Sequence, residues 1–319
     1  MSTVYLPPSR IYQNAVLDST RWQAFVPRAD DVVISTSYKS GTTWTLAIVR
    51  ELVVHEMQQA GITDPAQYPA PDNESSIWPD ARWICPIDEL HVTLEVQPHR
   101  RFLKSHLALD GLPIYPQVKY LIIARDPRDV FMSLWNHDRH LTDEFLDMLN
   151  TSPGRVGDEH PRSPADIHEF WAAWISRGSF EWEQEGYPYW GTMHHNQSWW
   201  NLRHLDNICL VHYADLKADP LGEIRGIAGF LGIEISDEAL VNVVERTSFD
   251  AMRERAIAAD ANRTSPFREG AKTFFYKGTN GRWRDTLTES ELAMYEQTKE
   301  NVLTPGCAHW LEMGRSGLV

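Results

Sequence analysis

One stretch near the start of the chain combines a short apolar strand, a turn rich in hydroxyl groups and a long apolar helix. Residues 31–35 are mostly β-branched, which predicts a buried strand, and the apolar run from about 43 to 55 predicts a helix. Between them lies the turn K-S-G-T-T at 39–43. Unpaired N–H groups at a helix start favour an anion, and a glycine lets the backbone approach it closely. The stretch predicts a phosphate site; the alternative is an ordinary helix cap beside a surface lysine.

The order of residues in this turn differs from that of a Walker loop. In the Walker motif the lysine follows the second glycine and precedes the hydroxyl residue that binds Mg²⁺. Here Lys39 precedes Gly41, the only glycine of the turn, so that hydroxyl has no counterpart. A nucleotide kinase that uses ATP and Mg²⁺ is the alternative enzyme, and a nucleotide-binding module without catalysis is the alternative binder.

Strands and helices are predicted to alternate along the chain. Further buried strands are predicted at 99–106, 119–124 and 207–213, and helices from Pro127 and over 167–185, 192–204, 220–231 and 236–246. A surface loop is predicted at 61–83, a mobile loop at 151–166 and a further loop at 256–272. This alternation predicts one α/β domain over residues 1–319, with a central parallel sheet flanked by helices.

Ligands of such sheets bind beyond the carboxyl ends of the strands. Lys39, His106 and Arg125 each follow the end of a predicted strand. We therefore expect these three side chains to meet at one edge of the sheet.

The composition narrows the classes of partner. The net charge of −14 argues against nucleic acid and other polyanions, which need a broad basic face. Three widely spaced cysteines are typical of reduced thiols in a cytoplasmic protein, and no group of ligand residues has metal spacing, so no metal is expected. Neither a signal peptide nor an apolar run of the ~20 residues that span a membrane is found. We expect a cytoplasmic protein without a membrane span.

Six segments share their pattern and order with one known family. They are K-S-G-T-T-W at 39–44, K-S-H-L at 104–107, R-D-P-R-D-V with a serine at 125–133, Y-A-D-L-K-A-D-P at 213–220, T-S-F-x-x-M at 247–252 and Y-K-G-x-x-G-R-W at 276–283. From about residue 28 to 290 the chain resembles the cytosolic-type sulfotransferases, in a bacterial-like form. The resemblance implies a P-loop-kinase-like sulfotransferase fold. It also implies transfer of a sulfuryl group from 3′-phosphoadenosine 5′-phosphosulfate (PAPS) to a hydroxyl or amine, which leaves PAP.

The resemblance also implies roles for individual residues. His106 would be the general base that takes the proton of the acceptor, and Lys39 would stabilise the leaving phosphate. Lys104 would either add charge at the sulfate or be a solvated strand end. The donor contacts implied by the resemblance are Lys39, Ser40, Gly41, Thr42, Thr43, Trp44, Arg125, Ser133, Tyr213, Thr247, Phe249, Tyr276, Lys277 and Gly278. A salt bridge to Asp126 or Asp129 is the alternative for Arg125.

Two departures from the family pattern bear on the donor and on assembly. Tyr276 stands where the family has an arginine, and Arg282 where it has an aspartate, so either Arg282 compensates or donor affinity is lower. The family's short dimer motif is not kept: its positions hold Arg284, Thr288, Glu289 and Ala293. The sequence therefore does not predict a dimer of that kind.

The acceptor is the least constrained part of the prediction. Trp78, Trp83, Trp135 and Tyr189 lie in or near the loops expected to wall the acceptor pocket. They suggest a small apolar or aromatic acceptor, such as a phenol, alcohol, steroid or lipid. The alternative is that these aromatic residues belong to the core.

Overall fold

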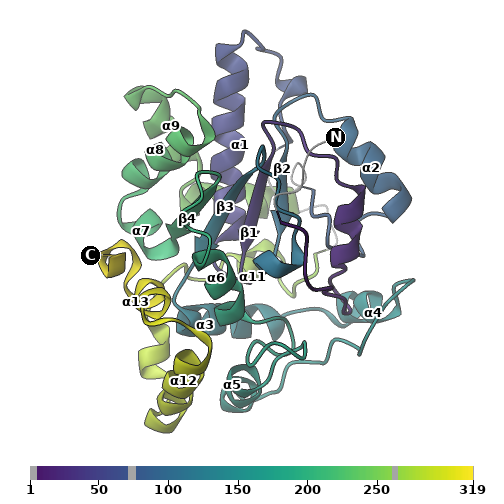
Figure 1. Cartoon of the computed structure of the whole chain (residues 1–319), viewed down its shortest axis with the longest axis vertical. Helices are drawn as coiled ribbons and strands as arrows, with labels where there is room; N and C mark the ends of the chain where they lie inside the picture. The colour runs from purple at the N-terminus through teal and green to yellow at the C-terminus, as the bar shows by residue number, and fades with distance from the viewer. Residues whose placement is uncertain (1–5, 71–76, 261–264, 319) are drawn as a thin grey trace.

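The computed structural model describes residues 6–70, 77–260 and 265–318, and its centre is a parallel β-sheet (Figure 1). The strands are β1 (Val32–Thr36), β2 (Phe102–Ser105), β3 (Lys119–Ala124) and β4 (Ile208–His212). Their order is β2-β1-β3-β4, and all three neighbouring pairs are parallel. The predicted central parallel sheet is confirmed. Because the strands are parallel, the turns that follow β1, β2 and β3 lie at one edge.

Helices cover both faces of the sheet. Val32 and Ile34 of β1 face a core cluster built with α1 (Thr42–Gln59), α8 (Pro220–Leu231) and α9 (Asp237–Arg246). Val33 faces the opposite cluster, built with α3 (Pro127–Asp138), α5 (Ile167–Ser176) and α6 (Thr192–Trp200). Since successive side chains of a strand point to opposite faces, an uninterrupted apolar run is what a doubly covered strand requires.

The remaining α-helices were not predicted from the sequence. They are α2 (Ile87–Glu95), α4 (Asp143–Thr151), α7 (Tyr213–Ala218), α10 (Phe249–Asp260), α11 (Ala271–Phe274), α12 (Glu289–Val302) and α13 (Pro305–Met313). The α10 helix occupies the first part of the loop predicted at 256–272, so that prediction is wrong there. No helix or strand lies at 152–166, as predicted, and the mobility of that segment stays a prediction.

The helix predicted at 167–185 ends nine residues early, at Ser176. Two acidic side chains explain the difference. Glu183 accepts a hydrogen bond from the N–H of Gly191, and Glu185 accepts from the N–H groups of Thr192 and Met193. These carboxylates satisfy the free N–H groups at the start of α6, where a negative charge is favoured. The segment must leave the helix to bring them there.

The loop predicted on the surface at 61–83 turns inward at its end. Residues 71–76 lie outside the described residues, but Trp78 and Asp80 are buried. The Asp80 carboxylate accepts hydrogen bonds from the indole N–H groups of Trp22, at 3.0 Å, and Trp78, at 2.7 Å. The prediction of a surface loop is therefore wrong for this part. Trp78 is anchored against the site described below.

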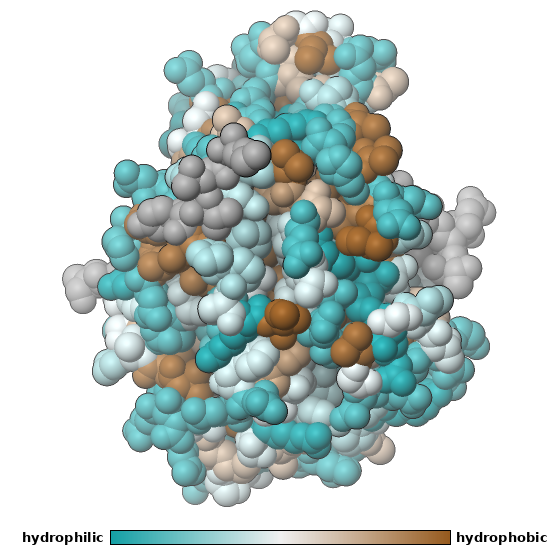
Figure 2. Space-filling model, turned by 45° about the vertical axis from the view of Figure 1, so that its right-hand side comes forward, coloured by the Kyte–Doolittle hydropathy of each residue, from teal (hydrophilic) through white to brown (hydrophobic). Residues whose placement is uncertain are grey.

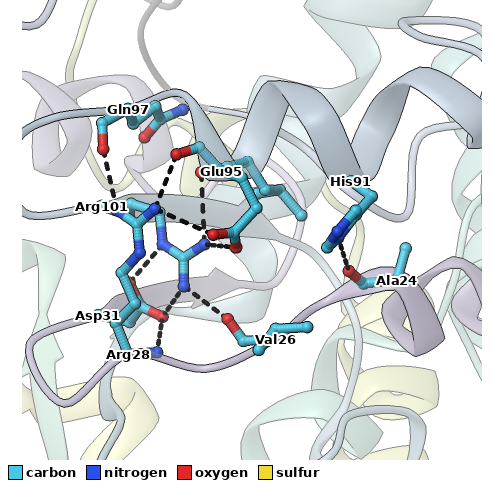
Figure 3. Close-up of polar contacts among 9 residues, drawn as sticks. Ala24, Val26, Arg28, Asp31, His91, Glu95, Gln97 and Arg101 are labelled. Carbon is cyan, nitrogen blue, oxygen red and sulfur yellow. Dashed lines mark hydrogen bonds and ion pairs between the residues drawn. The ribbon is translucent and has the colours of Figure 1, made fainter.

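A buried ion pair lies at the opposite, amino-terminal edge of the sheet (Figure 3). The guanidinium of Arg101 and the carboxylate of Asp31 both have an exposed fraction of 0%. Arg101 also donates to the backbone oxygens of Val26 and Leu94. Because β1 follows Asp31 and β2 follows Arg101, this pair fixes the starts of two neighbouring strands.

Hydrophilic residues cover much of the side of the molecule drawn in Figure 2. Figure 2 shows one side of the molecule, on which apolar residues form separate patches among hydrophilic ones. Within the described part of the chain, no helix is both long and apolar enough to cross a membrane.

Candidate active site

A cavity of about 400 Å³ lies where the turns after β1, β2 and β3 meet. Lys39, His106 and Arg125 all line it, as the sequence predicted from the strand ends. Every other predicted site residue lines it too, except Ser40. The Ser40 side chain is fully buried, and its hydroxyl lies 2.6 Å from the hydroxyl of Ser37. The Ser40 hydroxyl is therefore engaged within the turn, and its contact with the donor stays a prediction.

The start of α1 forms one wall of the cavity. Its N-cap, Gly41, has a φ of 111°, and a Cβ there would lie 2.9 Å from a ring atom of Tyr213. Glycine is thus required for both conformation and close approach. The N-cap glycine has no side chain to cap this helix, which leaves the first N–H groups for a ligand. Trp44 lies beside Tyr213, and its buried indole N–H has no partner among the described residues.

Two guanidinium groups, those of Arg125 and Arg282, line another wall. Arg125 donates to the side-chain oxygen of Asn280, at 2.7 and 3.1 Å, and to the backbone oxygens of Thr279 and Lys39. These acceptors carry no net charge. The alternative salt bridges of Arg125 are not formed in the structure: Asp126 pairs with Arg128, and Asp129 accepts from the N–H of Gly281.

Arg282 has spare hydrogen-bonding capacity. Its buried Nε has no partner within the described part of the chain. Burial lowers the pKa of its guanidinium, and the neighbouring charge of Arg125 lowers it further. A pair of close cations with an unused donor is an environment that favours an anionic ligand.

His106 is held in one tautomer. Its Nδ1 lies 2.8 Å from the backbone oxygen of Thr36. A carbonyl oxygen only accepts, so Nδ1 carries the proton and Nε2 keeps a lone pair. Burial lowers the pKa of His106 well below its ordinary value, and the charge of Lys104 lowers it further. The imidazole is therefore neutral at pH 7 and able to accept a proton at Nε2.

Lys104 lines the cavity, and its Nζ lies 4.0 Å from the centre of the Trp78 ring. Burial lowers its pKa to about 8, opposed by the carboxylate of Asp80. The Trp78 ring also packs edge-on against His106, with 5.0 Å between ring centres. The anchored Trp78 thus contacts two of the predicted catalytic residues.

Sequence reasoning missed His137, which lines the same cavity. Its Nδ1 lies 3.2 Å from Nζ of Lys39, and its Nε2 lies 2.8 Å from the hydroxyl of Tyr38. Burial lowers the pKa of Lys39 to about 7, helped by the charges of Lys104 and Arg125. The spacing in α3 could have indicated His137 from the sequence. This histidine follows the predicted site residue Ser133 by four positions, and residues four apart share one face of a helix.

The aromatic residues expected around the acceptor lie behind the cavity wall and not on its surface. Trp78, Trp83, Trp135 and Tyr189 belong to or pack against the core cluster and do not line the cavity, which favours the core alternative. The aromatic residues that do line it are Tyr38, Trp44, Tyr213, Phe249, Phe274, Phe275 and Tyr276.

A metal site is not formed by the residues that the structure describes: no group of three or more His, Cys, Asp or Glu side chains is placed to hold an ion. The expectation that no metal is needed stays a prediction.

Comparison with known sequences gives one consistent result. A family model described as a sulfotransferase domain matches residues 29–304. The chain is 31% identical over 324 residues to a glycolipid sulfotransferase of Mycobacterium bovis, covering 96% of this chain and 95% of that protein. It is 29% identical to sulfotransferase 1A1 of Rattus norvegicus, over 88% of this chain and 87% of that protein.

Solved structures show the same fold. Mouse sulfotransferase SULT7A1, complexed with PAP, matches with a TM-score of 0.67 and 18% identity, over 95% of this chain and 97% of that chain. Retinol dehydratase, in complex with androsterone and PAP, matches with a TM-score of 0.59 and 23% identity, over 94% of this chain and 88% of that chain.

Proposed function

Because this chain belongs to the sulfotransferase family, we propose that it moves the sulfuryl group of PAPS to a hydroxyl or amine of an acceptor with an apolar body. One observation carries the proposal. A single cavity holds a cationic wall at Arg125 and Arg282 together with His106, whose Nε2 is left free to accept a proton.

The cavity suits a donor with two phosphate groups. The uncapped N–H groups of α1, together with Thr42 and Thr43, suit the 5′-phosphosulfate. Arg125, Ser133 and Lys277 are proposed to hold the 3′-phosphate, and the unused Nε of Arg282 supports a role for that side chain there.

The adenine is proposed to lie among the aromatic rings of the same cavity. Trp44, Tyr213 and Phe249 line this cavity, and the buried Thr247 also lines it. Tyr276 and Gly278 lie at the same wall, where Gly278 packs closely against Phe249. Flat apolar faces beside a cationic wall match a purine attached to phosphates.

The chemistry follows from the two groups nearest the reacting atoms. Nε2 of His106 takes the proton of the acceptor hydroxyl while that oxygen bonds to sulfur. The bond from sulfur to the bridging oxygen breaks, and its electron pair stays on the phosphate. Lys39 stabilises that charge, and Lys104 adds charge near the transferred group. Positioning and electrostatics supply most of the catalysis in such in-line transfers.

The class of acceptor is proposed from the apolar residues that line the cavity near the catalytic groups. Tyr38 and Phe274 give the cavity an apolar surface close to His106 and Lys39, and Met252 also lines the cavity. The relative from Mycobacterium bovis is named for glycolipid acceptors. Hydroxylated lipids and simple phenols are therefore the acceptors to test first.

The experiment is thermal unfolding of the purified chain with PAP, with ATP plus Mg²⁺, and with neither. A ligand that binds only the folded state stabilises it by about 2.7 kcal/mol at a hundredfold excess over Kd. We expect PAP alone to raise the melting temperature without metal. Stabilisation by ATP with Mg²⁺ and not by PAP would contradict the proposal and favour a kinase. A PAP-binding chain that transfers sulfate to none of the acceptors would be a binding module.

A further inference from the structure

The amine of Lys39 forms a hydrogen bond with the side chain of His137. Lys39 has a φ of 61°, an unusual conformation for a residue other than glycine. Its Nζ lies 3.2 Å from Nδ1 of His137 and 4.7 Å from the ring centre of Phe274. Among the side chains that the structure describes, His137 is the only hydrogen-bond acceptor of this amine. The contact joins the turn after β1 to the last turn of α3.

When Lys39 is protonated, the proton positions of this pair follow from its two hydrogen bonds. An ammonium group only donates, so Nδ1 of His137 accepts from Lys39. Nε2 then carries the proton and donates to the hydroxyl oxygen of Tyr38, 2.8 Å away. Burial lowers the pKa of His137 well below its ordinary value, helped by the charge of Lys39. The neutral form needed at Nδ1 is therefore the stable one.

The ring of His137 is fixed from several sides. It packs against Tyr38, with 5.1 Å between ring centres, and against Phe267, at 4.7 Å. Tyr38 in turn stacks on Tyr189, whose hydroxyl donates to Asp138, the neighbour of His137 in α3. A side chain held in this way presents Nδ1 at one place.

The charges around Lys39 oppose its protonation. Lys104 from β2 and Arg125 from the end of β3 both lower the pKa of the ammonium, and burial has the largest effect. His137 itself is faced by Lys39, Lys104, His106 and His160. None of these groups supplies a negative charge. A hydrogen bond from the ammonium to a neutral acceptor is what favours the charged form here.

We propose that His137 is a positioning residue for Lys39, holding the ammonium protonated and in place at the boundary between the donor and the acceptor. The proposal rests on the proposed function, because it assigns Lys39 to the leaving phosphate. It adds a residue outside the motifs that carried the sequence prediction.

The test is a titration of Lys39 that does not depend on catalysis. The rate at which an amine-reactive reagent labels Lys39 is measured against pH by peptide mass spectrometry in the full chain. His137→Ala should lower the apparent pKa of Lys39 by about one pH unit, because a hydrogen bond to a charged group is lost. His137→Asn should restore most of the shift, since its side-chain oxygen can take the place of Nδ1.

A matched control comes from the same turn of α3. Asn136 lines the cavity and bonds the backbone oxygen of Thr273, not Lys39. Asn136→Ala should therefore leave the pKa of Lys39 unchanged. An equal shift in this control, or no shift in His137→Ala, would overturn the proposal.

Kinetics give the second readout. The alkaline limb of the kcat profile should move to lower pH in His137→Ala and return in His137→Asn, while KM for the donor changes less than kcat. An alkaline limb that stays in place would contradict the role of His137. If the chain transferred no sulfate at all, the proposed function would fail, yet the labelling titration would still decide whether His137 supports the Lys39 ammonium.

Discussion

The Nδ1 atom of His106 lies 2.8 Å from the backbone oxygen of Thr36, the last residue of β1. This contact joins two neighbouring strands of the sheet and sets the tautomer of the imidazole. The site therefore needs no rearrangement to present a basic nitrogen. The structure places that nitrogen in the same cavity as the cations at the ends of β1 and β3.

Removing the imidazole should separate catalysis from binding. We expect His106→Ala to lower kcat by roughly a hundredfold or more, the usual contribution of a general base. Binding of PAP, measured by calorimetry, should stay within about twofold of the parent. His204→Ala, at an exposed position, is the control and should keep full activity. A His106→Ala variant with parental kcat would remove His106 from the mechanism.

Arg282 should compensate for the tyrosine at position 276. It lines the cavity beside Arg125 and has an unused donor. Since a hydrogen bond to a charged group contributes about 1.5–3 kcal/mol, Arg282→Ala should weaken PAP binding roughly tenfold or more. Calorimetry of Arg284→Ala is the control, because Arg284 stacks on Trp283 and does not line the cavity. Parental affinity in Arg282→Ala would mean that Tyr276 is not compensated.

PAP should bind more weakly as the pH rises above neutrality. The pKa of Lys39 is about 7 in the free protein, and a bound phosphate raises it, so binding takes up a proton. Below pH 7 Lys39 is already charged and the affinity is at its highest. Between pH 7 and the pKa of the complex, Kd should rise by up to about tenfold per pH unit. Phosphate groups, with a second pKa near ~6, keep their charge over this window.

Calorimetry at pH 6.5, 7.5 and 8.5, in buffers of different ionisation enthalpy, would measure this proton uptake. Lys39→Met should bind PAP with a much flatter pH dependence. Lys104, with a pKa of about 8, is the remaining source of slope. An affinity that does not change over this range would show that Lys39 is not linked to the ligand.

The elements that sequence predicted well are those dictated by local pattern. The β3 strand was predicted at 119–124, the bounds that the structure shows, because its apolar run is long and ends at charged residues. The turn after β1 was predicted because its lysine, glycine and hydroxyl residues stand between a strand and the start of a helix. Both depend on neighbours within the same segment.

The predictions that were wrong or missing concern residues whose structure is set by contacts with segments far away in the sequence. The end of α5 is set by carboxylates that reach forward to α6, and the burial of Trp78 is set by Asp80 together with Trp22. Likewise, His137 becomes a site residue only because α3 packs beside the turn that carries Lys39. The sequence of one segment contains no information on its distant partners. The motifs therefore predicted the residues that line the cavity, but not the contacts that support them.

The ion pair of Asp31 with Arg101 should dominate the stability of the sheet's amino-terminal edge. Both side chains are fully buried, and Arg101 makes its bonds to Asp31, Val26 and Leu94 within the interior. Arg101→Met leaves the carboxylate of Asp31 without its positive partner, while the backbone N–H of Arg28 still donates to it. Breaking a buried pair in this way costs about 3–5 kcal/mol. Urea unfolding should show a lower midpoint with an unchanged m-value.

Two further variants decide whether the charge is the cause. Asp31→Leu combined with Arg101→Met removes both charges, so it should lose less stability than Arg101→Met alone. Arg225→Ala breaks an exposed pair with Asp237 and should cost less than about 1 kcal/mol. Because the buried pair lies at the edge opposite the cavity, PAP binding should persist in every variant that remains folded. A loss in Arg101→Met no larger than in Arg225→Ala would show that the carboxylate of Asp31 tolerates burial without a positive partner.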